Sequence, residues 1–318
     1  PQEGLANLPQ YGRRSPRGEC GPAFTVSRAG TAPGGATGLD CGRSPRGGPP
    51  GDAPLVLRLT HPGRVYWPDA GITKAALAAY YDALANRHLP HIAGRPLALV
   101  RCPHGIAESC FFQKHAWEGM PDAVGRTTSR GQELLSIRDR EGLRALAQAG
   151  ALEIHVWGAT LARLETPDRL VFDLDPGEGA TFADVIAAAL EVRERLAQSG
   201  LVSFARTTGG KGLHVVVPLA PGAGWAETKG FAAALARDMA ARSPERYVAT
   251  LSKAKRKGRV FVDYLRNGRA QTAIACFSPR ARPGAPVATP LAWGEVAPGL
   301  DPARFTIANV GTRLAAQT

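Results

Sequence analysis

The stretch RLVFDLDPGEG, residues 169–179, places two acidic side chains in a segment that otherwise has the pattern of a buried strand. Asp173 and Asp175 are two residues apart, so in a strand both point to the same face, while the apolar residues between them point to the opposite face. Burying two carboxylates side by side is unfavourable unless cations compensate their charge. The pair therefore raises the question of which cation neutralises it.

The elements expected around this stretch follow the order β-α-β-β-α-β, the split unit of ferredoxin-like and RNA-recognition folds. The four strands are expected at 170–175, 202–207, 213–219 and 259–265, and the two helices at 181–200 and 225–242. Thr181 and Asp184 have the spacing of a capping box at the start of the first helix. In this unit we expect the sheet order fourth, first, third, second strand. The fold class is therefore α/β (α+β), with a mixed or antiparallel catalytic sheet and packed helices.

The fourth strand contributes a third acid, Asp263. Antiparallel pairing brings its middle beside the first strand, so three carboxylates should converge on one sheet face. A lone D-x-D is also compatible with aspartates that cap the following turn, and the third acid makes that reading weaker. We expect Asp173, Asp175 and Asp263 to be catalytic and to hold two divalent ions, Mg²⁺ or Mn²⁺, which prefer oxygen ligands.

A glycine-rich turn, TTGGKGLH at residues 207–214, precedes the third strand. Backbone amides at Gly209, Gly210 and Gly212 can form an anion-binding nest, and Lys211 adds a positive charge. The spacing fits neither a Walker loop nor a dinucleotide fingerprint. A plain glycine hairpin is the alternative. The expected position beside Asp175 favours a phosphate group as the ligand.

The rest of the chain divides into a tail and a smaller module. Residues 1–53 are rich in Gly, Pro, Arg and Ser, contain RSPRG twice, and predict a basic disordered linker or tail. An N-terminal module is expected over about 54–165 and a catalytic module over about 166–318. In the N-terminal module we expect strands at 55–60, 95–103 and 151–158, helices at 74–89 and 140–150, and a loop at 104–122.

Composition points to a nucleic-acid partner. The formal net charge is +12 with a pI near 10.0, and excess Lys and Arg attract polyanions, although an arginine-favouring GC-rich genome would give the same bias. No apolar run approaches the roughly 18 residues of a membrane helix, so we expect no membrane partner and a cytoplasmic location.

The five cysteines show no C-x-x-C pair, which predicts free thiols in a reducing compartment, without a zinc cage or disulfide framework.

Five motifs occur in order: FFQKHA, LEIHVWGA, PDRLVFDLDPGEG, TTGGKGLHVVVPL and VFVDYLRNGR. Together they resemble the polymerase domain of bacterial ATP-dependent DNA ligase D, a member of the archaeo-eukaryotic primase superfamily, over about residues 55–315. The resemblance implies a primase-like fold and a template-directed DNA/RNA nucleotidyltransferase. Such an enzyme fills gaps and extends primers at double-strand break ends in non-homologous end joining, prefers ribonucleotides and uses two Mn²⁺ or Mg²⁺ ions.

The resemblance also implies roles for individual residues. Thr208 stands where serine is more usual, and Arg64 replaces a more usual lysine in a pocket that it forms with Lys74 for the 5′ phosphate of the downstream strand. The implied metal ligands are Asp173, Asp175 and Asp263. The residues expected to bind the nucleotide are Thr208, Gly209, Gly210, Lys211, His214, His155, Arg256 and Arg280. The residues expected to bind DNA are Arg64, Lys74, Phe111, Phe112, Lys114 and Lys253.

Two of these assignments have physical alternatives. Phe111 and Phe112 offer flat faces on which a template base can stack, and core packing is the alternative for either one. The basic run KAKRKGR at residues 253–259 is either a solvated loop or a contact with triphosphate or primer.

Three other functions remain open at this point. They are a primase that starts strands de novo, a metal-dependent nuclease, and a catalytically silent module that bridges DNA ends. The nest of glycine amides disfavours a nuclease, which has no triphosphate to bind. No K-x-D-G signature of a DNA ligase is present. The expected partners are DNA ends with a 5′ phosphate, nucleoside triphosphates, the end-binding protein Ku and a ligase module, with the chain itself a monomer associated with the nucleoid.

Overall fold

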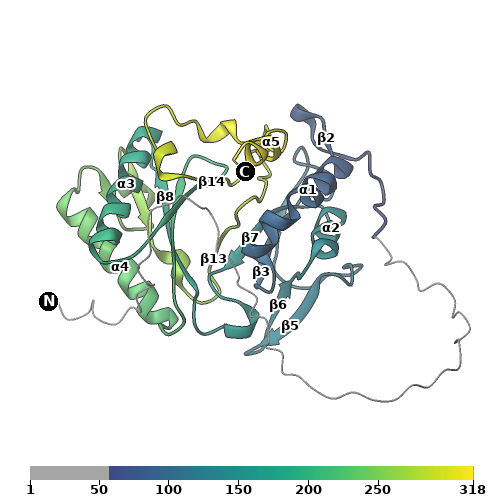
Figure 1. The fold of residues 1–318 in the computed structure, drawn as a ribbon, viewed down its shortest axis with the longest axis horizontal. Coiled ribbons are helices and arrows are strands. Elements are labelled where there is room, and N and C mark those ends of the chain that lie inside the picture. Colours follow the sequence, from purple (N-terminus) through teal and green to yellow (C-terminus); the bar gives the residue numbers. More distant parts are fainter. Residues whose placement is uncertain (1–56, 318) are drawn as a thin grey trace, which may run out of the picture. The chain divides into compact units, whose positions relative to one another are not determined.

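The computed structural model describes residues 57–317, in which two six-stranded sheets are packed with helices (Figure 1). The expected α/β class with antiparallel sheets is confirmed. The basic tail expected at 1–53 lies outside the described residues. Within residues 57–317, no helix is long and apolar enough to cross a membrane.

The catalytic sheet has the strand order β11-β12-β8-β10-β9-β14. Its inner four strands are the expected fourth, first, third and second strands of the split unit, so that prediction is confirmed. β11 and β14 extend the two edges beyond it. The strands of this sheet are β8 (Arg169–Pro176), β9 (Phe204–Thr207), β10 (Leu213–Pro218), β11 (Tyr247–Val248), β12 (Val260–Asp263) and β14 (Pro290–Leu291).

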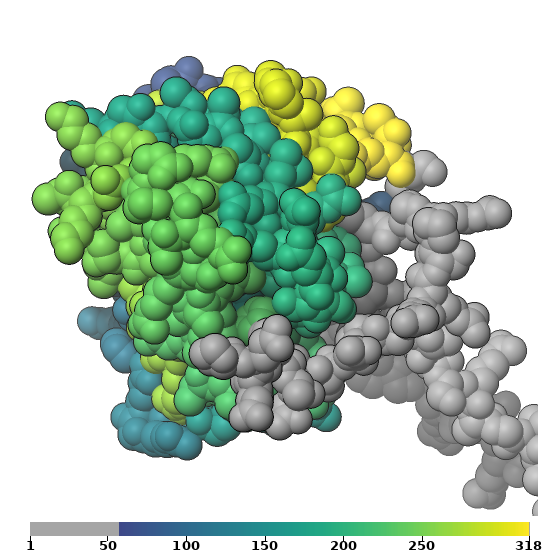
Figure 2. Space-filling model, turned by 90° about the vertical axis from the view of Figure 1, so that its left-hand side faces the viewer, coloured from purple at the N-terminus to yellow at the C-terminus, as the bar shows by residue number. Residues whose placement is uncertain are grey.

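Two helices cover one face of this sheet, α3 (Phe182–Gln198) and α4 (Trp225–Arg242). α3 begins at the expected capping box, in which the hydroxyl of Thr181 and the carboxylate of Asp184 each accept a backbone N–H. Phe172 of β8 is fully buried in the same core as residues of α3. The two helices form the side of the molecule seen in Figure 2. Because side chains alternate along a strand, Asp173 and Asp175 point to the face opposite Phe172, away from the helices.

The second sheet has the order β13-β7-β3-β6-β5, with β4 paired to β3. β13 comes from the C-terminal part of the chain and pairs with β7, so the chain returns to this sheet after leaving the catalytic one. The division into two modules near residue 165 stays a prediction. The strands are β3 (Leu97–Arg101), β4 (Phe111–Gln113), β5 (Gly125–Ser129), β6 (Gln132–Ser136), β7 (Ala151–Trp157) and β13 (Thr272–Ile274).

Shorter elements complete the described part of the chain. α1 (Lys74–Ile92) and α2 (Arg140–Gln148) accompany the second sheet, and a two-stranded ladder joins β1 (Val65–Trp67) to β2 (Ile72–Thr73). A six-residue helix, α5 (Val310–Ala315), lies near the C-terminal end. The 3₁₀ turns are Pro68–Ala70, Leu161–Arg163, Lys253–Arg256, Leu265–Asn267, Trp293–Glu295 and Pro302–Arg304.

Three local predictions for the N-terminal part were wrong or incomplete. Residues 57–60 form no strand, because Leu57 and Leu59 pack against the core without a neighbouring ladder, and residues 55 and 56 lie outside the described range. α1 starts at its expected N-cap, Thr73, but continues past Pro90 to the buried Ile92. The loop expected at 104–122 contains β4, which pairs with β3. The β5–β6 hairpin was not predicted.

The prediction of free thiols was wrong for Cys102 and Cys110 and right for Cys276. Cys102 and Cys110 form a disulfide, because the turn between β3 and β4 brings the two thiols together although they are eight residues apart. This bridge ties the end of β3 to the residue immediately before Phe111. Cys276 is a buried free thiol, and Cys20 and Cys41 lie outside the described residues.

A buried asparagine, Asn267, attaches the segment after β12 to β8. Its side chain accepts the Val171 N–H at 2.7 Å and donates to the carbonyl oxygens of Val171 and Tyr264 at 2.8 and 2.9 Å. Because β8 already pairs with β12 and β10, these bonds fix the turn that carries the preceding residue, Arg266, against the acidic face of the sheet.

We expect Asn267→Ala to lower the free energy of unfolding by about 2 to 4 kcal/mol, because it leaves the buried Val171 N–H and C=O without partners. Urea unfolding of the metal-free protein measures this change. The matched control is Asn86→Ala, which removes a surface hydrogen bond to Arg140. Equal destabilisation by the two substitutions would contradict the anchoring role of Asn267.

Candidate active site

The strand register gathers the three predicted acids on one face of the catalytic sheet. β12 pairs antiparallel with β8 so that Asp263 lies directly opposite Asp173, and Asp175 follows two residues along β8. Directly paired residues have Cβ atoms about 4.5 to 5.5 Å apart. Asp173 and Asp263 are both buried. The convergence that the sequence predicted is therefore present, and the role of the three acids as metal ligands stays a prediction.

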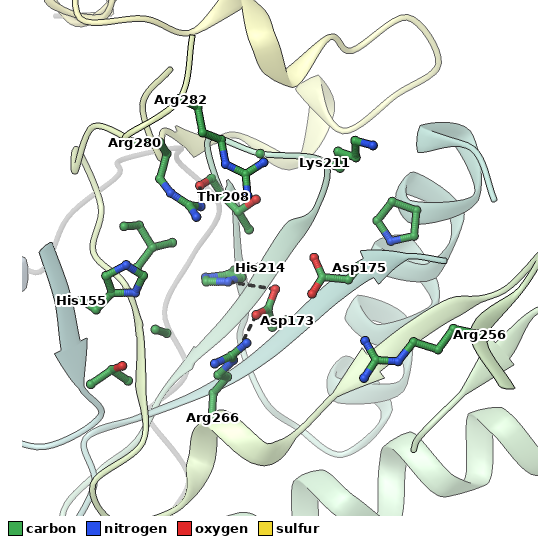
Figure 3. A pocket seen from close by; sticks show the side chains of 15 residues that line it. His155, Asp173, Asp175, Thr208, Lys211, His214, Arg256, Arg266, Arg280 and Arg282 are labelled. Atoms are coloured by element: carbon green, nitrogen blue, oxygen red, sulfur yellow. Dashed lines mark hydrogen bonds and ion pairs between the residues drawn. The ribbon is translucent and has the colours of Figure 1, made fainter. Parts of the chain in front are cut away.

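The cation between these acids is an arginine that the sequence analysis did not single out. Arg266 Nε lies 3.1 Å from Asp173 Oδ2 (Figure 3) and 3.3 Å from Asp263 Oδ2. Among residues 57–317, no three His, Cys, Asp or Glu side chains converge closely enough to enclose a metal ion. The sequence signal that could have identified Arg266 is the motif VFVDYLRNGR, in which it follows Asp263 by three residues.

The predicted nucleotide ligand His214 lies on the other side of Asp173. Its Nε2 is 3.1 Å from Asp173 Oδ1, and Arg206 directs its Nε and Nη2 at His214 Nδ1 at 3.1 and 2.9 Å. Because a guanidinium can only donate, Nδ1 must accept, and the proton of the neutral ring lies on Nε2, facing Asp173. Burial lowers the pKa of His214 to about 4, so the ring is neutral near pH 7. Sequence reasoning missed Arg206.

The three carboxylates have different proton affinities because their partners differ. Burial raises the pKa of Asp173, but its contacts with His214 and Arg266 outweigh burial and bring the pKa down to about 2. Asp175 has no hydrogen bond or ion pair within residues 57–317, and burial together with the charge of Asp173 raises its pKa to about 6. Burial also raises the pKa of Asp263. Asp175 is thus the least compensated of the three.

The glycine-rich turn lies against the end of β8, as expected. A Cβ at Gly212 would be 2.5 Å from the Leu174 carbonyl oxygen and 2.9 Å from Asp175 Oδ1, so only glycine permits this approach. Gly209 has a φ of +65°, which glycine adopts without strain. Lys211 is exposed, whereas Thr208 is buried and its hydroxyl donates to the Gly212 carbonyl oxygen. The turn therefore places Lys211 at the opening beside Asp175 (Figure 3).

Asp173, Asp175 and residues of the turn line one cavity of about 390 Å³, whereas Asp263 is not part of its lining. His155 of β7 closes it from the second sheet, with its Nε2 2.8 Å from Glu153 Oε2. Glu153 also forms an ion pair with Arg280 at 3.0 Å, and Arg280 donates to the Thr208 carbonyl oxygen at 2.6 Å. Side chains from distant parts of the sequence line the cavity: His155, Asp173, Asp175, Thr208, Gly210, Lys211, His214, Arg256, Arg266, Arg280 and Arg282. Arg282 was not predicted.

The predicted DNA contacts do not line this cavity. Arg64 donates to the Pro103 carbonyl oxygen at 2.9 Å, and the nearby Lys74 donates to the Gln148 carbonyl oxygen at 3.3 Å. Burial, and next the charge of Arg64, lower the pKa of Lys74. Arg64 and Lys74 lie near each other and Lys74 is buried, and the phosphate pocket that the sequence predicts for this pair stays a prediction. Lys114 and Lys253 are exposed.

Phe111 and Phe112 are on the surface, at β4. They are 45% and 63% exposed, which excludes core packing for either residue. The Phe112 ring lies 5.7 Å from the His155 ring, so β4 flanks the cavity. This position is suitable for stacking on a base that enters from the side of the second sheet.

The raised pKa of Asp175 predicts a pH-dependent stability. An acid whose pKa is raised on folding destabilises the folded state as pH rises from its unfolded pKa, near 3.8, to its folded pKa, near 6. Asp175→Asn should therefore stabilise the metal-free protein by about 2 kcal/mol at about pH 8, and the gain should vanish below about pH 4. Urea unfolding in EDTA measures it, with the exposed Asp122→Asn as control. A gain independent of pH would contradict this assignment.

Comparison with known proteins identifies the family. A family model described as LigD, primase-polymerase domain, matches residues 73–318. The multifunctional non-homologous end joining protein LigD of Pseudomonas aeruginosa is 38% identical over 274 residues, which cover 85% of this chain and 32% of that protein. The LigD protein of Mycolicibacterium smegmatis is 39% identical over 256 residues, covering 78% and 34%. This chain thus spans about a third of the length of these relatives.

A solved structure gives the same result. The polymerase domain from Mycobacterium tuberculosis ligase D, in complex with DNA, superposes with a TM-score of 0.75 at 34% identity, covering 82% of this chain and 94% of that one. The resemblance seen in the five sequence motifs is confirmed over most of residues 57–317. The chain belongs to the family of LigD primase-polymerase domains.

Proposed function

We propose that this chain is a template-directed nucleotidyltransferase that fills gaps and extends primers at DNA double-strand breaks during non-homologous end joining. The observation that carries the proposal is that Asp173, which pairs with Asp263 across the sheet, and Asp175 line a cavity that also contains residues of the TTGGKG turn. Carboxylates on one side and a basic, glycine-rich turn on the other suit the two ends of a metal-bound nucleoside triphosphate. Membership of the LigD primase-polymerase family supports the same reaction.

The donor set fits Mg²⁺ or Mn²⁺. Asp173, Asp175 and Asp263 offer only oxygen ligands, which hard divalent ions prefer, and the Arg266 guanidinium already stands in for a cation between two of them. When bound, two such ions would activate the attacking oxygen and stabilise the leaving one. The residues that would hold them are these three aspartates.

The chain's own residues perform the remaining tasks. The glycine amides and Lys211, with Arg256, Arg280 and Arg282 lining the same cavity, neutralise and orient the triphosphate. The primer 3′ hydroxyl oxygen then attacks the α-phosphorus, the bond to the bridging oxygen breaks, and pyrophosphate leaves.

His155 lies beside the nucleotide, on the side of the second sheet. The preference for ribonucleotides is proposed from the family resemblance alone.

The DNA contacts follow from the surface around the cavity. Phe112 and Phe111 stack on the template base, Arg64 and Lys74 hold the 5′ phosphate of the downstream strand, and the exposed Lys114 and Lys253 contact the DNA backbone. The structure of the similar M. tuberculosis polymerase domain is that of a complex with DNA, which supports this part of the proposal. Ku and a ligase module are proposed partners of a monomeric chain, in the cytoplasm at the nucleoid.

De novo priming would use the same cavity and is distinguished by an assay without primer. A nuclease is disfavoured by the glycine-rich turn, since cleavage of DNA requires no site for a triphosphate. A silent end-bridging module is disfavoured because it has no need for three carboxylates on one sheet face.

Asp173→Asn should reduce primer extension on a gapped duplex with Mn²⁺ by about a hundredfold or more, because it removes a charge aimed at the reacting phosphate and its ions. The matched control is Asp238→Asn, which removes exposed ion pairs on α4. Single-turnover extension with labelled primer is the measurement. Extension by the Asp173 variant at the rate of the control would exclude the proposed reaction.

Lys74→Gln should weaken binding to a gapped duplex with a 5′-phosphorylated downstream strand by about tenfold, since hydrogen bonds to charged groups contribute about 1.5 to 3 kcal/mol. Binding to the same duplex with a 5′ hydroxyl should be unchanged. Fluorescence anisotropy compares the two duplexes, and Lys229→Gln on α4 controls for loss of a positive charge. Equal weakening on both duplexes would mean that Lys74 does not read the phosphate.

A further inference from the structure

We propose that Arg266 is an internal counter-cation that occupies the acidic cluster in the metal-free protein and must leave when a divalent ion binds. This inference rests on the proposed function, because it assumes that Asp173 and Asp263 receive a metal. It adds a role that the reaction itself does not require: Arg266 sets how readily the metal binds.

The contacts divide the carboxylate oxygens into two sets. Asp173 Oδ1 is held by His214 Nε2 at 3.1 Å, and Asp263 Oδ1 accepts the Leu265 N–H at 2.7 Å. The remaining oxygens, Oδ2 of both aspartates, face Arg266 Nε at 3.1 and 3.3 Å. Departure of the guanidinium would therefore free one oxygen on each aspartate, while the other oxygen keeps the side chain oriented. These two oxygens and the unpaired Asp175 are the ligands available to a metal.

The exchange requires movement of a single side chain. Asn267 fixes the backbone of this turn through three hydrogen bonds, two to Val171 of β8 and one to Tyr264 within the turn, so the turn can stay in place when Arg266 leaves. The Arg266 side chain is 37% exposed, whereas the side chains of Asp173 and Asp263 are 10% and 5% exposed. Arg266 lines the open cavity (Figure 3). Its guanidinium can thus swing into the cavity without disturbing the core.

Charge supplies the driving force. One guanidinium cannot neutralise three carboxylates, and Asp175 has no ion pair within residues 57–317. A divalent ion brings twice the charge to the same place and tolerates direct oxygen ligation. Once released, Arg266 remains in the cavity with Lys211, Arg280 and Arg282 and adds to the positive charge that meets a triphosphate. Metal binding and nucleotide binding are then coupled through one side chain.

The direct test is Mn²⁺ binding to the metal-stripped protein, without nucleotide or DNA, by electron paramagnetic resonance. Arg266→Gln should lower the dissociation constant for Mn²⁺ by about tenfold or more, because a neighbouring charge within 4 to 6 Å typically changes the affinity for a proton by about ten- to a thousandfold. Arg266→Lys keeps the charge and should stay closer to the wild type. Arg269→Gln, three residues on and paired with Glu165, should bind Mn²⁺ as the wild type does.

Unchanged or weaker Mn²⁺ binding by Arg266→Gln would overturn the proposal. A second measurement uses the wild type and does not depend on the variant folding: the ¹⁵Nε signal of Arg266 should lose its hydrogen-bonded character on titration with Mg²⁺, while that of Arg195, whose Nε donates to Glu191 at 3.0 Å, stays constant. Persistence of the bonded signal at saturating Mg²⁺ would also overturn it. If Asp173→Asn leaves wild-type Mn²⁺ affinity unaltered, the failure lies with the proposed metal site and not with Arg266.

Discussion

Two buried carboxylates and a third, half-buried one share one face of the catalytic sheet, and their negative charge must be compensated for the chain to fold. Asp173, Asp175 and Asp263 are brought together by the pairing of β12 with β8, and in water-poor surroundings such a cluster is unstable without compensation. His214 and Arg266 each contact Asp173 and so compensate part of this negative charge. Arg206 fixes His214, and Asn267 fixes the turn that carries Arg266. The shells of polar residues around the acids are thus arranged to hold negative charge in place without neutralising it completely.

The second sheet completes the site. His155 and Glu153 are on one face of β7, and Glu153 binds both His155 and Arg280. Burial raises the pKa of Glu153, but its contacts with His155 and Arg280 bring it down to about 2, so it stays charged and holds Arg280 against the Thr208 backbone. The cavity is therefore acidic on the side of the catalytic sheet and basic at the glycine-rich turn, which is the polarity that a metal-bound triphosphate requires.

Local sequence signals were sufficient for the four inner strands of the catalytic sheet and its two helices, but not for the edge strands β11 and β14. The alternation in 169–176, the capping box at Thr181 and the glycines of 207–212 each specify their own element, and their order limits the topology to one familiar arrangement. Signals of this kind fail where a partner comes from far along the chain. Of the strand expected at 55–60, the described residues 57–60 have the right alternation but no neighbouring strand. The hairpin of β5 and β6 carries short polar segments that resemble a loop.

The same reason explains which site residues were missed. In the sequence, Arg206 near the end of a strand cannot be distinguished from a surface arginine. Its role follows from its contact with His214 in the fold. The role of Arg266 depends on its contact with Asp173, which lies 93 residues away in the sequence. The disulfide between Cys102 and Cys110 likewise depends on the turn before β4 and not on a spacing motif. Charge compensation is a property of the folded arrangement, so sequence reasoning located the acids but not the cations that hold them.

Anomalous X-ray diffraction from crystals grown with Mn²⁺ and a non-hydrolysable nucleoside triphosphate tests the central claim most directly. The account predicts manganese bound by Asp173, Asp175 and Asp263, with the triphosphate at the TTGGKG turn and Arg266 no longer bridging two aspartates. Manganese at another site, or a nucleotide bound while Arg266 still bridges Asp173 and Asp263, would contradict it.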